Sequence, residues 1–346
     1  MHWAILARRQ NGVWYLSVMS LSRRMLLSQG LTAMAAVALP HSRGGISGQR
    51  RIALTFDDVP RDPGAFFSTA ERTERLIENL RGEGVEQAAF FVVPGFIAEP
   101  GKADGAAHIA AYAAAGHIIA NHTWDHPRLS DVSAAEFVKS IAQTEKWLKG
   151  KPGYRPWFRF PYLDQAYFQS AKNRKVSVYL RKGGLADAWV TVDGSDWAIE
   201  ARTRLAARRR EKIDLSALRA SYVRTMVHAA EFYDQLAVSL IGRSPAHVIL
   251  LHEADVTTLC LGEFVRALRA RGWTIITADE AYADPLYHAL PLGSAKDFCG
   301  IHPGPAHCPN PAWVDHPLAT GPTVFELLAW AAGRKGPNRY PGTGQW

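Results

Sequence analysis

The sequence predicts an α/β fold made of about seven parallel β/α units. Short apolar runs bounded by polar residues, such as residues 52–56 and 248–251, are typical of buried strands. They alternate with longer segments of helical periodicity, which is typical of a parallel sheet whose helices connect one strand to the next. The chain has 346 residues, of which 47% are hydrophobic, so one large domain of this kind can bury a substantial core.

The predicted strands and helices follow one another along the chain. Strands are expected at residues 52–56, 88–93, 117–120, 158–160, 189–193, 248–251 and 273–276. Helices are expected at residues 65–81, 106–115, 133–149, 166–180, 198–240 and 262–270. Gly116 suits the left-handed residue that often follows a helix, and Ser133 with Glu136 forms the pattern of a capping box. Residues 166–240 are less regular and are expected to contain a helical insertion.

We expect three parts in the chain. Residues 1–45 form an N-terminal extension, residues 46–283 form the α/β domain, and residues 284–346 form a C-terminal extension rich in Pro and Gly. Within the last part, one short helix is expected near residues 324–331.

The N-terminal extension contains a segment, residues 19–40, that resembles an export signal. Arg23-Arg24 followed by Met-Leu-Leu is similar to a twin-arginine signal, and Ala36-Val37-Ala38 is a possible cleavage site. The apolar run at residues 31–39 is too short to span a bilayer. We therefore expect export to the periplasm without a stable membrane span in the mature protein. Met19 is an alternative start, and a plain N-terminal helix is the competing interpretation.

The basic residues are unevenly distributed. The formal net charge is +8, and much of the excess lies near the N-terminus and at residues 202–210. Basic residues interleaved with aromatics, as a nucleic-acid interface needs, do not occur, so no nucleic-acid partner is expected. We interpret the Arg-rich run as a solvated helix face.

The three cysteines are Cys260, Cys299 and Cys308. Cys299 and Cys308 could pair in an oxidising compartment, although spacing alone leaves this open. Cys260 stands in an apolar segment and is interpreted as an inert core thiol.

Polar clusters stand at the ends of five predicted strands. They are Asp57-Asp58, His122-Thr-Trp-Asp-His126, Arg159-Phe-Pro-Tyr162, Asp193-Gly-Ser-Asp196-Trp197 and Leu250-Leu251-His252. Each cluster alone has an ordinary structural interpretation, since Asp is common after strands and a histidine pair often lies in a core. In parallel α/β folds the functional site lies at the carboxyl ends of the strands, so five such clusters in one chain predict a common site. The spacing of His122 and His126 favours one side of a helical turn.

Here the chain resembles a known family, the polysaccharide deacetylases (carbohydrate esterase family 4, the NodB-homology domain). The resemblance covers residues 50–280, and its motifs match the five clusters, the first read as Thr55-Phe-Asp-Asp58. It implies a distorted (β/α) barrel. Val59 stands where the family usually has Gly, and residues 166–240 are longer than expected between the motifs.

The resemblance implies that Asp58, His122 and His126 hold a divalent metal. Two neutral imidazoles and one carboxylate are also the donors that catalytic Zn²⁺ uses, with positions left for water and substrate. Zn²⁺ is therefore the expected cofactor, with Co²⁺ or a similar ion as the alternative.

The resemblance also implies the remaining roles. Asp57 would be the base, Arg159 its ion-pair partner, and His252 the acid, held by Asp196. The backbone N–H of Tyr162 would help to stabilise the oxyanion. Trp197 would form a wall of the substrate groove, although simple core packing remains open for it.

The function expected from this resemblance is metal-dependent removal of N-acetyl groups, with release of acetate, from a polysaccharide or oligosaccharide containing N-acetylglucosamine. A deformylase or an O-acetyl-xylan esterase on the same fold is the alternative within enzymes. A catalytically inactive glycan-binding module is the alternative from another class. The partner is an acetylated glycan, and the oligomeric state stays open.

Overall fold

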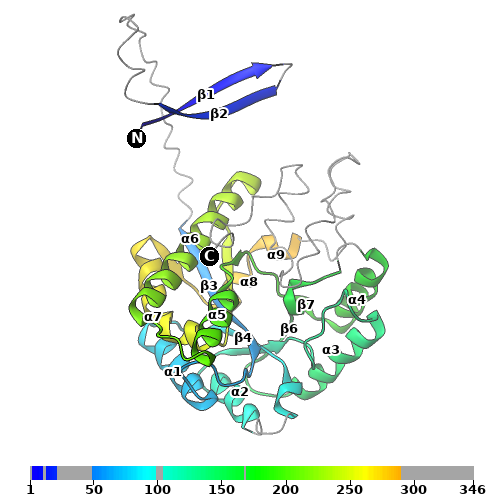
Figure 1. Cartoon of the computed structure of the whole chain (residues 1–346). Helices are drawn as coiled ribbons and strands as arrows, with labels where there is room; N and C mark the ends of the chain where they lie inside the picture. The colour runs from blue at the N-terminus through cyan, green and yellow to red at the C-terminus, as the bar shows by residue number, and fades with distance from the viewer. Residues whose placement is uncertain (1, 11–12, 22–48, 99–103, 167–168, 290–346) are drawn as a thin grey trace, which may run out of the picture. The chain divides into compact units, whose positions relative to one another are not determined.

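The computed structural model describes residues 2–10, 13–21, 49–98, 104–166 and 169–289 (Figure 1). The chain divides into two compact units, residues 1–46 and residues 47–346. In the first unit, β1 (His2–Gln10) and β2 (Val13–Leu21) form an antiparallel hairpin. The predicted export signal lies almost entirely outside the described residues, as do Cys299, Cys308 and the helix expected near residues 324–331.

The second unit contains one parallel sheet that curls into a distorted barrel, as predicted. The order of its strands is β7-β6-β5-β4-β3-β9-β8, and β10 pairs with the start of β3. The strands are β3 (Arg50–Val59), β4 (Ala89–Val92), β5 (Ile118–Asn121), β6 (Tyr154–Phe158), β7 (Ala186–Asp187), β8 (Val192–Asp193), β9 (Ala246–His252) and β10 (Trp273–Ile275). All pairings in this sheet are parallel.

The barrel is closed by a connection rather than by a pair of strands. The edge strands β7 and β8 are joined by residues 188–191. The N–H of Ala188 donates to the carbonyl oxygen of Phe158 at 2.7 Å, and the N–H of Thr191 donates to that of Val248 at 3.0 Å. Because this segment connects two strands, only Val192–Asp193 of the strand predicted at residues 189–193 is a strand in the structure.

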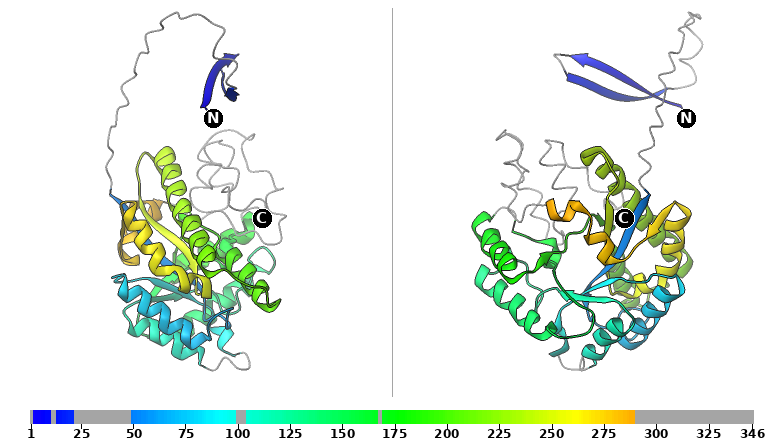
Figure 2. Two further views of the ribbon diagram at one scale, coloured as in Figure 1. Left: turned by 60° about the vertical axis from the view of Figure 1, so that its left-hand side comes forward. Right: turned by 180° about the vertical axis from the view of Figure 1, so that it is seen from behind.

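Helices surround the barrel (Figure 2). They are α1 (Thr69–Gly82), α2 (Gly105–Ala114), α3 (Ala134–Leu148), α4 (Ser170–Gly183), α5 (Asp196–Arg208), α6 (Leu215–Ile241), α7 (Asp255–Ala270), α8 (Ala278–Tyr282) and α9 (Pro285–Ala289). Short 3₁₀ turns occupy η1 (Pro94–Ala98) and η2 (Pro161–Leu163). None of the described helices is long and apolar enough to cross a bilayer.

Local signals explain which helix boundaries were predicted correctly. The capping box of Ser133 and Glu136 is present at the start of α3, and Gly116 follows α2 with φ 92°. By contrast, α7 begins at Asp255 and not at Gly262, where the sequence predicted its start. The start was missed because the residue before it, Ala254, has no capping side chain that the sequence could reveal.

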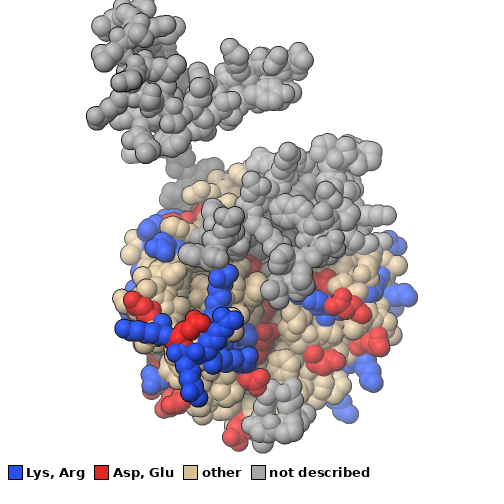
Figure 3. Space-filling model, viewed as in Figure 1, with Lys and Arg blue, Asp and Glu red and all other residues tan. Residues whose placement is uncertain are grey.

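The long helix predicted at residues 198–240 is two helices. The chain leaves α5 after Arg208 and starts α6 where the Asp214 carboxylate accepts a hydrogen bond from the N–H of Ala217 at 3.0 Å. The Arg-rich run lies at the end of α5 and in this turn, and it is exposed. Figure 3 shows Lys and Arg side chains gathered on the side of the molecule where α5 lies.

The buried apolar residues form three clusters, one of which packs β3 and β4 against α1, α2, α6 and α7. The ring of Phe90 stacks on those of Phe56 and Tyr112, at centroid distances of 4.9 and 4.0 Å, respectively. Cys260 is fully buried in this core, and burial raises the pKa of its thiol to about 12. The prediction that Cys260 lies in the core is therefore confirmed.

Candidate active site

Two adjacent carboxylates reach the site because β3 contains a bulge. On a regular strand Asp57 and Asp58 would point to opposite faces of the sheet. The pairing of β3 with β4 shifts between Phe56 and Val59, and Asp58 has φ 66°. A bulge re-aims the side chains beside it, so both acids can face the same end of the barrel.

The two histidines lie in a loop after β5, not on a helical turn, so that prediction was wrong. The Asn121 side chain organises the loop by accepting a hydrogen bond from the N–H of Thr123 at 2.8 Å. The hydroxyl of Thr123 in turn accepts from the N–H of His126 at 3.0 Å. Thr123 and His126 both have positive φ, which excludes a helix here.

Asp58, His122 and His126 form a cluster that fits a divalent metal. One ligand atom from each lies within 4.8 Å of the others. Asp58 Oδ1 is 2.9 Å from His126 Nε2 and 3.5 Å from His122 Nε2, and it is buried without a hydrogen-bond donor. His122 Nδ1 must donate to the carbonyl oxygen of Arg159 at 2.8 Å, which leaves its Nε2 lone pair free for a metal.

The charge of Asp58 is stabilised by its neighbours. Burial alone would raise the pKa of this carboxyl, but His126, His122 and Arg61 hold it well below its ordinary value. The Arg61 guanidinium lies 3.2 Å from Asp58 Oδ2. A carboxylate beside two imidazoles is a donor set that suits a divalent cation.

Arg159 is buried and forms an ion pair with Asp57. Its Nη1 donates to Asp57 Oδ1 at 2.6 Å and to Thr55 Oγ1 at 2.9 Å. Its Nη2 donates to the hydroxyl of Tyr282 at 2.7 Å, and its Nε donates to the carbonyl oxygen of Ala188 at 3.0 Å. The other oxygen of Asp57, Oδ2, lies 3.6 Å from His122 Nε2, at the edge of the metal-ligand cluster. Nothing in the sequence marked Tyr282 as a partner.

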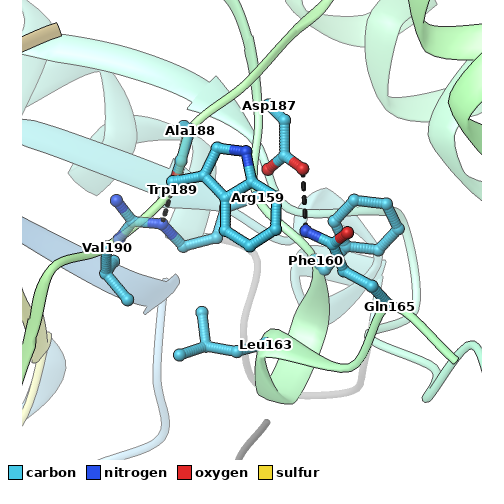
Figure 4. A pocket seen from close by; sticks show the side chains of 8 residues that line it. All are labelled: Arg159, Phe160, Leu163, Gln165, Asp187, Ala188, Trp189 and Val190. Carbon is cyan, nitrogen blue, oxygen red and sulfur yellow. Dashed lines mark hydrogen bonds between the residues drawn. The ribbon is translucent and has the colours of Figure 1, made fainter. Parts of the chain in front are cut away.

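A pocket lies beside Arg159 (Figure 4). Its lining includes Leu163, Trp189 and the hydrogen-bonded pair of Gln165 and Asp187, which is 2.8 Å long. Burial raises the pKa of Asp187 to about 8. Asp57, which contacts Arg159 directly at 2.6 Å, is the carboxylate that balances the charge of Arg159.

His252 stands next to Asp57 because their strands are in register. The two residues are direct partners in the pairing of β3 with β9. His252 Nδ1 lies 2.7 Å from Asp196 Oδ1, and its Nε2 lies 4.0 Å from Asp58 Oδ2. Burial lowers the pKa of this imidazole, but the Asp196 carboxylate outweighs burial and raises it to about 9. The hydroxyl of Thr257 donates to Asp196 Oδ2 at 2.8 Å.

Tyr162 and Trp197 differ in how they relate to the site. The ring of Tyr162 lies 4.5 Å from that of His126, between centroids, and its backbone has φ 57°. Trp197 follows Asp196 on α5, and its indole N–H is buried without a hydrogen-bond partner. The described contacts do not join the Trp197 side chain to the other predicted site residues.

A second buried ion network lies behind the site and was missed in the sequence. Arg72 is 3.5 Å from Glu253 Oε2 and 3.1 Å from Asp255 Oδ1. Tyr112 donates to Glu253 Oε1 at 2.8 Å, and the N–H of Arg61 donates to Glu253 Oε2 at 2.8 Å. The network therefore holds the loop after Asp58 against the residues that follow His252. The only signal was the position of Glu253 directly after a motif histidine.

Residues 44–179 match the family model for polysaccharide deacetylases. Over these residues the chain is similar to the polysaccharide deacetylases. Asp57, Asp58, His122, His126 and Arg159 fall inside the matched residues, whereas Asp196 and His252 lie beyond them.

Curated relatives share part of their length with the chain. A peptidoglycan-N-acetylglucosamine deacetylase of Listeria monocytogenes is 26% identical over 239 residues, which are 68% of this chain and 40% of the relative. A chitooligosaccharide deacetylase of Azorhizobium caulinodans is 31% identical over 152 residues, 43% of this chain and 62% of that protein. The chain thus spans two fifths of the Listeria relative's length.

Among solved structures, a family 4 carbohydrate esterase from Streptomyces lividans aligns with a TM-score of 0.44 and 22% identity, over 67% of this chain and 95% of that one.

Proposed function

We propose that the protein removes N-acetyl groups from a glycan containing N-acetylglucosamine and releases acetate, with a divalent metal, Zn²⁺ in first place, held by Asp58, His122 and His126. The observation that carries the proposal is the different surroundings of two adjacent acids. Asp58 Oδ1 faces the Nε2 atoms of both histidines, while Asp57 is held by Arg159 on one oxygen only. Asp58 is thus suited to bind a metal, and Asp57 is suited to accept a proton. The names of the relatives support the substrate class.

The bound metal would polarise the acetamide carbonyl and lower the pKa of the attacking water. Asp57 Oδ2 is the base that takes the proton of this water, and Arg159 fixes the orientation of the carboxylate through Oδ1. His252 gives a proton to the leaving amine from Nε2, since Asp196 holds Nδ1 and favours the charged imidazolium.

The remaining predicted residues stabilise and enclose the reacting group. The backbone N–H of Tyr162 assists the oxyanion, and the ring of this left-handed residue lies beside that of His126. Trp197 is proposed as a wall of the substrate groove, where its unpaired indole N–H can donate to a sugar.

The test is acetate release by the full-length, metal-loaded protein from chitooligosaccharides, peptidoglycan fragments and acetylxylan. We expect release from the N-acetylated glycans, and little from acetylxylan. The chelated protein and the Asp57→Asn variant are the controls. Release from acetylxylan alone would replace the proposal with an O-acetyl esterase, and glycan binding without any turnover would indicate an inactive binding module.

We further propose that residues 1–45 carry a twin-arginine-type export signal ahead of a catalytic domain at residues 46–283. Replacement of Arg23-Arg24 by Lys-Lys is expected to keep the precursor in the cytoplasm, as measured by cell fractionation. Unchanged delivery to the periplasm would contradict this assignment.

A further inference from the structure

A series of basic side chains leads from the metal-ligand cluster to the turn between α5 and α6. We call it the cationic strip and define it as Arg61, Arg204, Arg208, Arg209, Arg210 and Lys212.

Arg61 forms the inner end of the strip. Its guanidinium lies 3.2 Å from Asp58 Oδ2, and its side chain is 22% exposed. Its backbone is fixed by the buried network, because the N–H donates to Glu253 and the carbonyl oxygen accepts from Arg72. The loop thus presents a positive charge directly beside the catalytic centre.

Arg204 continues the strip along α5. Asp196, Glu200 and Arg204 are spaced four residues apart, so they lie near one face of the helix. Asp196 and Glu200 are buried and Arg204 is half-buried, so this face emerges from the barrel toward the surface. Burial raises the pKa of Glu200, and the charges of Arg61 and Arg204 both oppose that rise. Both positive charges thus act on the same carboxylate.

The outer end of the strip has few counter-charges. Arg208, Arg209, Arg210 and Lys212 are all exposed. Arg209 has one exposed ion pair, with Glu211 at 3.8 Å, and in the described part of the chain the other three have none. At about 1.5 Å per residue, α5 carries the strip roughly 20 Å from Asp196. Figure 3 shows basic side chains gathered in this area.

We propose that the cationic strip binds carboxylate groups of an anionic N-acetylated glycan, so that the enzyme prefers acidic strands to neutral ones. Guanidinium groups match carboxylates in charge and in geometry. The inner end of the strip lies beside Asp58, so its occupant must reach the catalytic centre, which a substrate strand does and a lipid surface does not. This inference rests on the proposed function, because it concerns the substrate of the same site.

The test compares two triple variants that remove the same charge. The strip variant is Arg208→Gln with Arg209→Gln and Arg210→Gln, at residues far from the catalytic groups. The control variant is Arg174→Gln with Lys175→Gln and Lys182→Gln, at exposed positions on α4. Both are made in the full-length, metal-loaded protein.

Binding and acetate release are measured for two glycans of equal length, a neutral chitooligosaccharide and a peptidoglycan-derived strand that carries carboxylates. For the anionic strand at low salt, the strip variant is expected to raise Kd and KM roughly three- to tenfold. Its kcat, and its Kd for the neutral glycan, should not change, and the control variant should behave as wild type. High salt should remove the difference, because exposed charges are screened.

Equal Kd values for the wild type and the strip variant on the anionic strand would overturn the inference, as would an equal loss with the control variant. Vesicles containing phosphatidylglycerol test a lipid surface, which the exposed Leu205 and Leu215 could also contact. If the strip variant loses vesicle binding but binds the anionic glycan normally, the strip is a membrane contact instead. Absence of acetate release from every glycan refutes the proposed function, while the Kd comparison still decides the strip.

Discussion

Arg159 and Arg72 are two arginines with almost the same burial and different positions relative to the reacting groups. Each is 1% exposed and each pairs with carboxylates. Arg159 contacts Asp57 itself, at 2.6 Å. Arg72 contacts Glu253 and Asp255, which follow His252 in the chain.

The comparison teaches that a buried ion network does not by itself indicate catalysis. The Arg72 network connects two parts of the backbone, because Asp255 Oδ2 accepts hydrogen bonds from the N–H groups of Phe66 and Phe67 at 2.6 and 2.8 Å. Asp255 thus pairs two part-buried backbone N–H groups. The Arg159 network instead contacts Asp57, the base of the proposed mechanism. Substitutions should therefore separate the two by their effect on kcat.

The largest effect is expected for Arg159→Gln. The substitution leaves Asp57 buried without its cation, so the free energy of unfolding should fall by about 3–5 kcal/mol. The orientation of the base is lost as well, so kcat per folded molecule should fall by about 10²-fold or more. Denaturant unfolding and kcat measured on the folded fraction test both parts. A folded Arg159→Gln variant with wild-type kcat would show that Arg159, like Arg72, only stabilises the fold.

Arg72→Gln should destabilise the fold by a similar amount, about 3–5 kcal/mol, because Glu253 and Asp255 lose their buried partner. In this case kcat per folded molecule should stay near the wild-type value. Arg75→Gln, at an exposed position of the same helix, is the control and should change stability by no more than about 1 kcal/mol, the size of its cation–π contact with Phe67. A loss of kcat in Arg72→Gln equal to that of Arg159→Gln would mean that both networks serve the reaction.

Sequence reasoning found one arginine and missed the other for a physical reason. Arg159 stands in a motif at the end of a strand, and strand ends meet at one edge of a parallel sheet. Arg72 is an ordinary arginine in the first turns of a helix, and its partners Glu253 and Asp255 lie 181 and 183 residues away. A pairing over that distance leaves no local pattern.

The same limit applies to the shape of the site. The order of strands and helices was predictable because hydrophobic periodicity and capping signals are local. The bulge that turns Asp58 toward the histidines and the loop geometry of His122 and His126 depend on neighbouring strands and on Asn121. The break between α5 and α6 has only the Asp214 cap as its signal, and the Arg-rich stretch around it kept the helical pattern.

A smaller effect should appear at two neighbouring threonines of α7. Thr257 donates a hydrogen bond to Asp196 at 2.8 Å, whereas the hydroxyl of Thr258 is buried without a partner. Thr257→Val should lower the free energy of unfolding by about 1.5–3 kcal/mol, since the lost bond is to a charged group. Thr258→Val keeps the shape and should be neutral or stabilising. Thermal unfolding of the two variants measures the difference. Equal effects would show that the hydrogen bond from Thr257 to Asp196 does not stabilise the fold.

The division of labour between Asp57 and Asp58 is the central claim, and bound metal and kcat measured together for their amide variants test it most directly. Asp58→Asn weakens a ligand and should lose both metal and turnover. Asp57→Asn should retain the metal at wild-type affinity while kcat falls by about 10²–10⁴-fold, the usual contribution of a general base. Equal loss of metal in the two variants, or an Asp57→Asn enzyme with wild-type kcat, would contradict the account.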